Sequence, residues 1–600
     1  HELVAFLMQN GTVTLSELKL HFKQPERLVK LLAERGVLEV EKVRVFRTIE
    51  SSMTAPATPN QLNPDQVAAL TQIVAALDGG EFHSFLLNGV TGSGKTEVYM
   101  HAIVKVLEMG RQALVLVPEI ALTPQLMSTF RGRFGDQVAI LHSALSPGER
   151  YDQWCQVAAG TRSIVVGARS AIFCPLNRLG LVVVDEEHEP SFKQDERPFY
   201  NARDLALVRG RQAGATVVLG SATPSLESHF NVVNGKFQEL LLPRRATPRP
   251  LPDVVIVDLK EAGFLDEDRI LSRPLAKAIE ERIALGEQVI LFINRKGFAA
   301  FLLCSACGAV PRCPQCDISL TLYKRSGLAR CHYCQFATPA PSSCPTCGSE
   351  DLQEIGAGTE RVTEMLATHF PSARIARLDS TTSSGKRLTD TLSSFRNRTL
   401  DILVGTQIVA KGHDFPGVTL VGVLLADLGL SFPDFRASER TFQLLTQVAG
   451  RAGRGNIPGQ VFVQTYLPNH YALVHAQRHD FSSFAKEELT HRRFRRYPPY
   501  GCLALFRFNG PELERVQEAA QLAANLIVPH TRDGKLEILG PGLSPLSFLR
   551  GRFRLQLMLR APSRPALQRL LRVLGPQLGK RLPRSTALRW EIDVDPSNLM

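Results

Sequence analysis

The sequence predicts an α/β protein with two parallel-sheet lobes, an N-terminal winged helix, a cysteine-rich insertion in the second lobe and an α+β C-terminal domain. Short apolar runs alternate with helix-length segments in two separate sets, which is typical of parallel strands covered by helices on both faces. A phosphate-loop motif follows the first apolar run. Eight of the 11 cysteines form C-x-x-C pairs inside one short stretch, and this spacing is typical of zinc ligands.

Composition limits the class of protein and of partner. The chain has 600 residues, 44% of them hydrophobic, which is enough for several cores. A formal charge of +12 favours a polyanionic partner, with nucleic acid first among them. Apolar stretches fall short of the ~20 residues that a membrane span needs, and no signal peptide is visible. Because clustered C-x-x-C pairs suit a reducing compartment, we expect a cytoplasmic protein without a membrane partner.

The first 50 residues predict a winged helix. Helical patterns cover residues 15–22 and 25–35, and the alternating run at 37–45 is typical of a two-stranded wing. Arg27 and Lys30 would then lie on a recognition helix facing DNA. An interaction or packing module explains the same pattern equally well.

Two sets of apolar runs predict the two lobes. The first set is 85–87, 113–117, 163–166, 181–184 and 216–219, and the second is 289–292, 402–404, 418–425 and 461–463. The predicted domains are 1–50 (winged helix), 51–61 (linker), 62–235 (lobe 1), 236–303 and 351–475 (the two parts of lobe 2), 304–350 (insertion) and 476–600 (C-terminal domain).

The phosphate-loop motif lies between an apolar strand and a helical pattern. Its small residues would let backbone N–H groups wrap the phosphates of ATP at a helix N-terminus. Lys95 would reach the β- and γ-phosphates, and the Thr96 hydroxyl would bind Mg²⁺. The motif consists of Gly89, Val90, Thr91, Gly92, Ser93, Gly94, Lys95 and Thr96.

Two further motifs would complete an ATP-hydrolysing site. Asp185 and Glu186 follow the strand at 181–184, so we expect Asp185 to hold Mg²⁺ and Glu186 to polarise the attacking water. A solvated loop is the competing interpretation. In lobe 2, the motif that begins at Gln447 contains Arg451 and Arg454, three residues apart on one helical face. These arginines would stabilise the transferring phosphoryl group when the lobes meet, unless they are ordinary surface residues.

The paired cysteines predict two zinc sites of four thiolates each, and spacing alone allows three groupings of the pairs. Cys155, Cys174 and Cys502 are isolated, so we expect them to pack as small apolar residues. The paired cysteines are Cys304, Cys307, Cys313, Cys316, Cys331, Cys334, Cys344 and Cys347.

These motifs, with residues 220–224 and 404–416, resemble those of superfamily 2 helicases, whose two P-loop lobes are RecA-like. Because the cysteine pairs follow residues 294–298, the chain resembles the PriA-type (primosomal protein N′) family of replication-restart helicases over nearly its whole length. Lys296 stands where that family often has arginine. The family usually has a further N-terminal domain that binds the 3′ end of a nascent strand, and this domain lies outside the resemblance.

The resemblance implies ATP-dependent 3′ to 5′ movement on single-stranded DNA at stalled or collapsed forks, and initiation of primosome assembly. Its implied partners are single-stranded and forked DNA, single-stranded DNA-binding protein, primosome proteins and the loader of the replicative helicase. Arg564 and Gln568 are candidates for binding the acidic tail of single-stranded DNA-binding protein. Two alternatives stay open: a fork-binding scaffold with an incidental motor, and a duplex translocase or RNA helicase.

The resemblance also assigns residues. It implies a nested zinc grouping, with the outer pairs holding one ion and the inner pairs the other. Gln66 resembles an adenine-reading glutamine, and residues 189–204 resemble an aromatic-rich DNA-binding loop. Phe192, Phe199 and Tyr200 would stack on bases there, although ordinary core packing explains them too.

Overall fold

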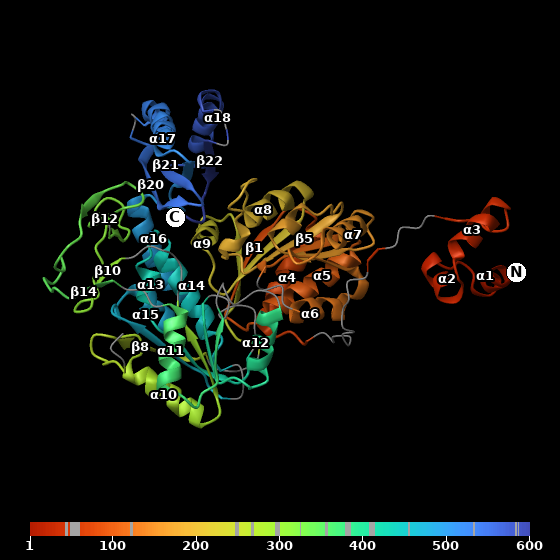
Figure 1. Ribbon diagram of the computed structural model, residues 1–600, viewed down its shortest axis with the longest axis horizontal. Coiled ribbons are helices and arrows are strands. Elements are labelled where there is room, and N and C mark those ends of the chain that lie inside the picture. Colours follow the sequence, from red (N-terminus) through yellow and green to blue (C-terminus); the bar gives the residue numbers. More distant parts are fainter. Residues whose placement is uncertain are drawn as a thin grey trace. The chain divides into compact units, whose positions relative to one another are not determined.

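The computed structural model describes most of the chain, and many of its elements are labelled in Figure 1. Contacts divide the chain into two compact units, residues 1–50 with 146–152, and residues 51–145 with 153–600. The described residues are 1–41, 46–47, 60–119, 124–246, 251–265, 269–293, 301–324, 326–354, 358–378, 386–406, 415–453, 457–531, 534–582, 585 and 587–599.

The N-terminal part contains three helices, α1 (Glu2–Asn10), α2 (Leu15–His21) and α3 (Pro25–Glu34). Thr14 and Glu17 cap α2 reciprocally, since the Thr14 N–H donates to Glu17 Oε2 at 2.8 Å and the Glu17 N–H to Thr14 Oγ1 at 3.3 Å. The two predicted helices are therefore confirmed. Residues 37–41 form no strand, and the rest of the predicted wing at 42–45 lies outside the described residues.

Lobe 1 is a seven-stranded parallel sheet in the order β3-β4-β2-β5-β6-β1-β7. Since β7 pairs with β1, lobe 1 extends past residue 235, and the predicted lobe boundary there is wrong. Hydrophobic residues of β7 complete the core beside β1. The strands are β1 (Ser84–Gly89), β2 (Gln112–Leu116), β3 (Val138–Leu141), β4 (Ile164–Gly167), β5 (Leu179–Asp185), β6 (Thr216–Ser221) and β7 (Gln238–Leu242), and the helices are α4 (Pro64–Gly79), α5 (Lys95–Glu108), α6 (Pro124–Phe134), α7 (Pro147–Ala158), α8 (Ala202–Ala213) and α9 (Leu226–Val233).

Lobe 2 is a six-stranded parallel sheet in the order β15-β16-β9-β17-β18-β8. Its central strands β16, β9 and β17 are buried throughout, as expected of a sheet with helices on both faces, whereas the edge strands β15 and β8 are only partly buried. The strands are β8 (Asp253–Asp258), β9 (Gln288–Phe292), β15 (Ile375–Leu378), β16 (Ile402–Gly405), β17 (Val418–Val423) and β18 (Gln460–Thr465), and the helices are α10 (Arg273–Ala284), α11 (Thr359–His369), α12 (Lys386–Arg396), α13 (Asp427–Leu430), α14 (Ala437–Ala449), α15 (Tyr471–Gln477) and α16 (Phe481–Arg495).

The cysteine-rich insertion leaves lobe 2 after β9 and returns before α11. Antiparallel strands β10 (Leu302–Cys304) and β14 (Leu352–Glu354) pair at its base. A second small antiparallel sheet contains β11 (Thr321–Tyr323), β12 (Leu328–Arg330) and β13 (Ala337–Pro339).

The C-terminal domain confirms the predicted α+β character with an antiparallel sheet in the order β20-β21-β19-β22. Alternate residues of β19 point to opposite faces. Phe506 and Phe508 pack with the helices, whereas Leu503 and Leu505 pack against the cysteine-rich insertion. The elements are β19 (Cys502–Gly510), β20 (Glu537–Leu549), β21 (Arg552–Ala561), β22 (Arg589–Val594), α17 (Leu513–Ile527) and α18 (Arg564–Arg581). Among the described residues, no helix has the length and apolar character to span a membrane.

Candidate ATP site and metal centres

The phosphate loop joins β1 to α5. Gly92 and Gly94 have φ angles of 82° and 79°, a left-handed backbone that favours glycine. The Lys95 ammonium donates to the Gly89 carbonyl at 2.9 Å and is largely buried. Ser93 Oγ is buried and meets no hydrogen-bond partner among the described residues. A buried hydroxyl without a protein partner, beside a lysine and a helix N-terminus, fits the oxygens of a bound nucleotide.

Gln66 braces this loop. Its Nε2 donates to the Ser93 carbonyl at 2.9 Å, and its Oε1 accepts from the Asn63 N–H at 2.8 Å. A Cβ on Gly94 would lie 2.3 Å from Gln66 Nε2, so the glycine permits the close approach. Because the amide oxygen and one amide donor are already bonded to protein, adenine reading by Gln66 stays a prediction.

Residues 185–188, which we call the acidic motif, lie at the carboxyl end of β5. Asp185 Oδ1 accepts from the Tyr99 hydroxyl at 3.1 Å. Burial, together with the neighbouring Glu186, raises the pKa of Asp185 to about 6, and the positive charge of Lys95 opposes this rise. Glu186 has a φ of 49°, a sparsely populated conformation for a residue with a side chain. Asp185 therefore lies close enough to Lys95 of the phosphate loop for their charges to interact, and the roles of Asp185 and Glu186 toward Mg²⁺ and water stay predictions.

Glu187, in the same motif, stabilises the start of α9. Its carboxylate accepts from the Ser225 N–H at 2.6 Å and from the Ser228 hydroxyl at 2.8 Å, which fixes the start of α9. The next N–H of α9, that of Leu226, donates to Glu439 Oε1 of α14 at 3.0 Å. The acidic motif of lobe 1 is thus connected to a helix of lobe 2.

His188 makes a second connection between the lobes. Its Nδ1 lies 2.7 Å from Ser221 Oγ of β6, and its Nε2 lies 2.8 Å from Gln447 Nε2 of α14. An amide N–H₂ group only donates, so His188 Nε2 accepts from Gln447 and the His188 Nδ1–H donates to Ser221 Oγ. Ser221 Oγ also accepts from the Thr223 N–H at 2.9 Å. His188 directly follows the predicted acidic residues and Ser221 lies within residues 220–224, but neither residue was predicted to have a role.

The end of α14 lies against the phosphate loop. A Cβ on Gly450 would lie 2.6 Å from Thr91 Cγ2, so a larger residue there would collide with the loop. Gln447, on the same end of α14, contacts His188 of the acidic motif. Arg451 follows directly after Gly450 in the sequence. The γ-phosphate role of Arg451 stays a prediction, and Arg454 lies outside the described residues.

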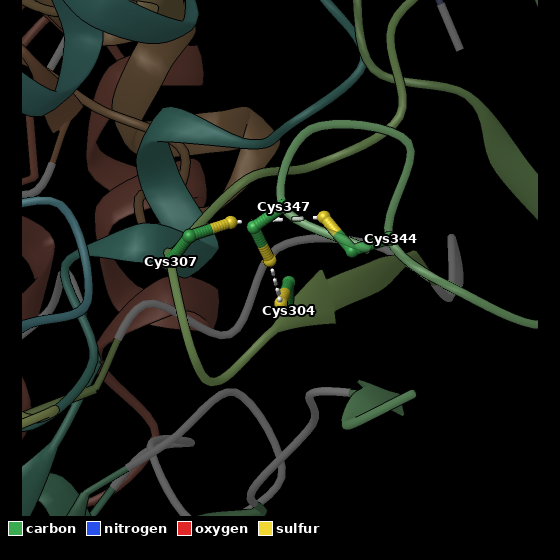
Figure 2. Close-up of side chains that lie close together, drawn as sticks. All are labelled: Cys304, Cys307, Cys344 and Cys347. Atoms are coloured by element: carbon green, nitrogen blue, oxygen red, sulfur yellow. Dashed lines mark hydrogen bonds between the residues drawn. The ribbon is translucent and has the colours of Figure 1, made fainter. Parts of the chain in front are cut away.

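The eight paired cysteines form two sets of four. Within each set all sulfur atoms lie within 4.8 Å of one another. Figure 2 shows the side chains of one set turned toward each other. The grouping is the nested one, with Cys304, Cys307, Cys344 and Cys347 in one set and Cys313, Cys316, Cys331 and Cys334 in the other.

Sulfur separations in both sets fit zinc. The sulfurs of Cys304 and Cys347 are 3.6 Å apart, and those of Cys313 and Cys334 are 3.5 Å apart. A tetrahedron with Zn–S bonds of about 2.3 Å has edges of about 3.8 Å, whereas a disulfide needs about 2 Å. The Thr346 N–H also donates to Cys344 Sγ at 3.4 Å, which favours the thiolate that zinc requires. The donor sets therefore match two zinc ions.

The predicted aromatic-rich loop follows the acidic motif. Phe192 is only 1% exposed, so in this arrangement it is core packing. Phe199 and Tyr200 are part-exposed, and Tyr200 packs edge-on against Phe173 at 5.0 Å. Stacking on bases by Phe199 and Tyr200 stays a prediction.

Family models match each of these parts. They describe a DEAD/DEAH box helicase over residues 63–231, a helicase conserved C-terminal domain over 354–456, a PriA DNA helicase Cys-rich region over 313–339, and a primosomal protein N C-terminal domain over 493–597. The replication restart protein PriA of Bacillus subtilis is 43% identical over 95% of this chain and 71% of its own length. That of Synechocystis is 42% identical over 100% of this chain and 72% of its own length.

The chain belongs to the PriA family of replication-restart DNA helicases. The predicted family, fold class and general function are therefore confirmed, as is the use of zinc and nucleotide. Within the PriA family the Haemophilus influenzae protein is a further relative, 40% identical over 90% of this chain and 72% of its own length.

Proposed function

We propose that this PriA-family chain hydrolyses Mg²⁺-bound ATP beside the phosphate loop and thereby moves 3′ to 5′ along single-stranded DNA. The observation that supports this proposal best is the meeting of α14 with the phosphate loop, where Gly450 approaches Thr91 and Gln447 contacts His188. Since both lobes contribute to one nucleotide site, a change in the nucleotide alters the contact between them.

Each site residue has a role in this proposal. Lys95 exchanges its bond to a backbone carbonyl for the β- and γ-phosphates, and Thr96 and Asp185 hold Mg²⁺. Glu186 orients the attacking water. Arg451, together with Arg454, neutralises charge on the γ-phosphate. Ser93 Oγ, buried without a protein partner among the described residues, supports nucleotide binding at this edge of the sheet.

The biological setting is the second part of the proposal. The positive charge and the PriA family favour single-stranded and forked DNA as the substrate. We infer that primosome proteins, the loader of the replicative helicase and single-stranded DNA-binding protein are its partners. Arg564 would meet the acidic tail of single-stranded DNA-binding protein. In this structure Arg564 also lies 3.2 Å from Asp595, so an acidic tail would compete with that carboxylate.

The Lys95→Ala variant tests the motor. We expect DNA-stimulated ATP turnover to fall by about a hundredfold or more, because one charged group contacting the phosphates is lost, while DNA affinity is retained. Lys105→Ala is the matched control, since Lys105 lies on the same helix and pairs with Asp78 at 2.9 Å on the exposed side. Undiminished turnover in Lys95→Ala would refute the assignment.

Polarity and substrate class need a separate measurement. We expect unwinding of a duplex with a 3′ single-stranded overhang and none with a 5′ overhang, and a preference for DNA over the matching RNA. Equal unwinding of the RNA duplex would favour the RNA-helicase alternative, because the 2′-hydroxyls would then be tolerated. Full replication restart by Lys95→Ala in cells would favour the scaffold alternative.

A further inference from the structure

Residues 593–599, which we name the junction segment, contact four parts of the molecule. The segment begins at the end of β22 in the C-terminal sheet. It then reaches the loop that follows the acidic motif of lobe 1, the start of α14 in lobe 2, and the core around the inner cysteine set. None of its residues belongs to the motifs that define the ATP site or the zinc sites.

Lobe 1 contacts the junction segment through a buried ion pair. Lys193 Nζ lies 2.7 Å from Asp593 Oδ1 and donates to the Val594 carbonyl at 2.8 Å. The two charged side chains are 5% and 0% exposed. Farther along, the Ser597 hydroxyl donates to Asp195 Oδ1 at 3.1 Å. Lys193 and Asp195 both lie in residues 190–201, which we call the 190–201 loop, so the junction segment holds this loop at two points.

Lobe 2 contacts the junction segment through two arginines at the start of α14. Arg436 donates to the Pro596 carbonyl at 3.2 Å, and Arg440 donates to the Ser597 carbonyl. Asp434 holds Arg440 in place at 3.1 Å. Ser597 therefore contacts lobe 1 with its hydroxyl and lobe 2 with its carbonyl. Gln447, at the opposite end of the same helix, contacts the acidic motif.

The far end of the segment is anchored. Arg507 donates to the Asn598 carbonyl at 3.1 Å. Leu599 is 1% exposed and shares a core with Cys313 and Cys331 of the inner cysteine set and with Tyr333. An anchored segment transmits displacement, because a well-packed core deforms little.

We propose that the junction segment is a positioning element for ATP hydrolysis, which transmits a DNA-induced displacement of the 190–201 loop to α14 and so to the Gln447 contact. The proposal rests on the proposed motor function. Ser597 is its central residue because it joins the two lobes directly. Several hydrogen bonds to the junction segment have its backbone carbonyls as acceptors. The contact between the lobes therefore depends more on the backbone path of the segment than on its side chains.

The double variant Arg436→Gln/Arg440→Gln removes the lobe 2 side of this connection. We expect turnover at saturating single-stranded DNA to fall by about fivefold or more, the usual lower range of coupling between sites. Turnover without DNA and the DNA concentration giving half-maximal stimulation should change less than about twofold. Arg374→Gln is the matched control, because Arg374 is an exposed lobe 2 arginine that pairs with Asp401 away from the segment. Arg436→Lys/Arg440→Lys should restore part of the stimulation.

Hydrogen exchange gives a readout that does not depend on activity. In the parent chain, single-stranded DNA should change exchange both in residues 190–201 and in residues 443–449 of α14. In Arg436→Gln/Arg440→Gln the first change should remain and the second should disappear. Retention of both changes together with full stimulation would overturn the proposal. A parent chain whose turnover ignores DNA would instead refute the motor function itself.

Discussion

The zinc sites and the ATP site are built in opposite ways. Each zinc set takes its four ligands from one short segment, 304–347 or 313–334. One ion can therefore bind all four thiolates without any residue from outside the insertion. The proposed ATP site draws on distant segments of two lobes, since Gln447 of α14 meets His188 of lobe 1. The first kind of site depends on an ion and the second depends on how the lobes are arranged.

This difference predicts which parts of the molecule a substitution at each site affects. Loss of a zinc ligand should unfold structure locally, and the effect should reach the C-terminal domain, because Leu503 and Leu505 share a core with Cys316. Loss of an inter-lobe contact should leave both lobes folded and change turnover alone. Three variants, ordered by expected effect, test the contrast.

Cys331→Ser should have the largest effect. Cys331 is fully buried, and a structural zinc contributes about 10 kcal/mol or more to folding. We expect zinc content to fall from two ions to one per chain, measured by elemental analysis, and the melting temperature to drop by several degrees. ATP affinity in lobe 1 should be unchanged.

Cys155→Ser provides the control for that experiment, because Cys155 is part-exposed and outside both cysteine sets. It should keep two zinc ions and the parent melting temperature. Two zinc ions in Cys331→Ser would contradict the four-thiolate assignment of the inner set.

The pH dependence of the free energy of unfolding should show an effect of intermediate size, caused by His470, which lies close to Arg312 of the insertion. Burial, together with Arg312 of the insertion and His491, lowers the pKa of His470 to about 4. Its Nδ1 accepts from the Ala472 N–H at 3.2 Å and so caps α15. The unfolded chain, with an ordinary histidine pKa of about 6.5, binds the proton more readily. The free energy of unfolding should therefore fall as pH decreases from about 6.5 toward 4, by up to about 2 kcal/mol after allowance for the part-exposed ring.

His470→Asn separates this cause from general acid denaturation. Asparagine also caps helices but does not titrate in this range, so the dependence between pH 4 and 6.5 should flatten by about that amount. His369→Asn, at the exposed end of α11, controls for the replacement of a histidine as such. Denaturant unfolding at several pH values measures both, and an unaltered slope in His470→Asn would contradict the interpretation.

Local chemistry made much of this structure predictable. The predicted strands of both lobes are present, because a parallel strand buried on both faces leaves an apolar run in the sequence. The nested zinc grouping came from the family resemblance, since spacing leaves three groupings open. The lobe boundary at 235 was misplaced because β7 joins the lobe 1 sheet beside β1, and its short apolar run 240–242 does not by itself indicate which of the two sheets it joins.

The connections between domains were not predictable in this way. His188 and Ser221 lie inside recognised motifs, yet the contact between His188 and Gln447 depends on the packing of α14. The bonds from Arg436 and Arg440 end on carbonyls, which every residue carries, so no residue type marks their acceptors.

Ser221→Ala should have the smallest effect and tests the inter-lobe side of the comparison. It removes the acceptor of the His188 Nδ1 proton without removing any proposed phosphate, metal or water ligand. One hydrogen bond contributes about 1 kcal/mol, which corresponds to about fivefold in turnover. We expect that loss in kcat with KM for ATP unchanged, because His188 positions Gln447 and does not bind the ground-state nucleotide. Ser84→Ala is the control, since the Ser84 hydroxyl donates to the Lys236 carbonyl at 3.1 Å at the start of β1, the end opposite the phosphate loop. If both variants lost turnover equally, sheet stability would explain the effect. If neither did, the His188–Gln447 contact would be a by-product of lobe packing.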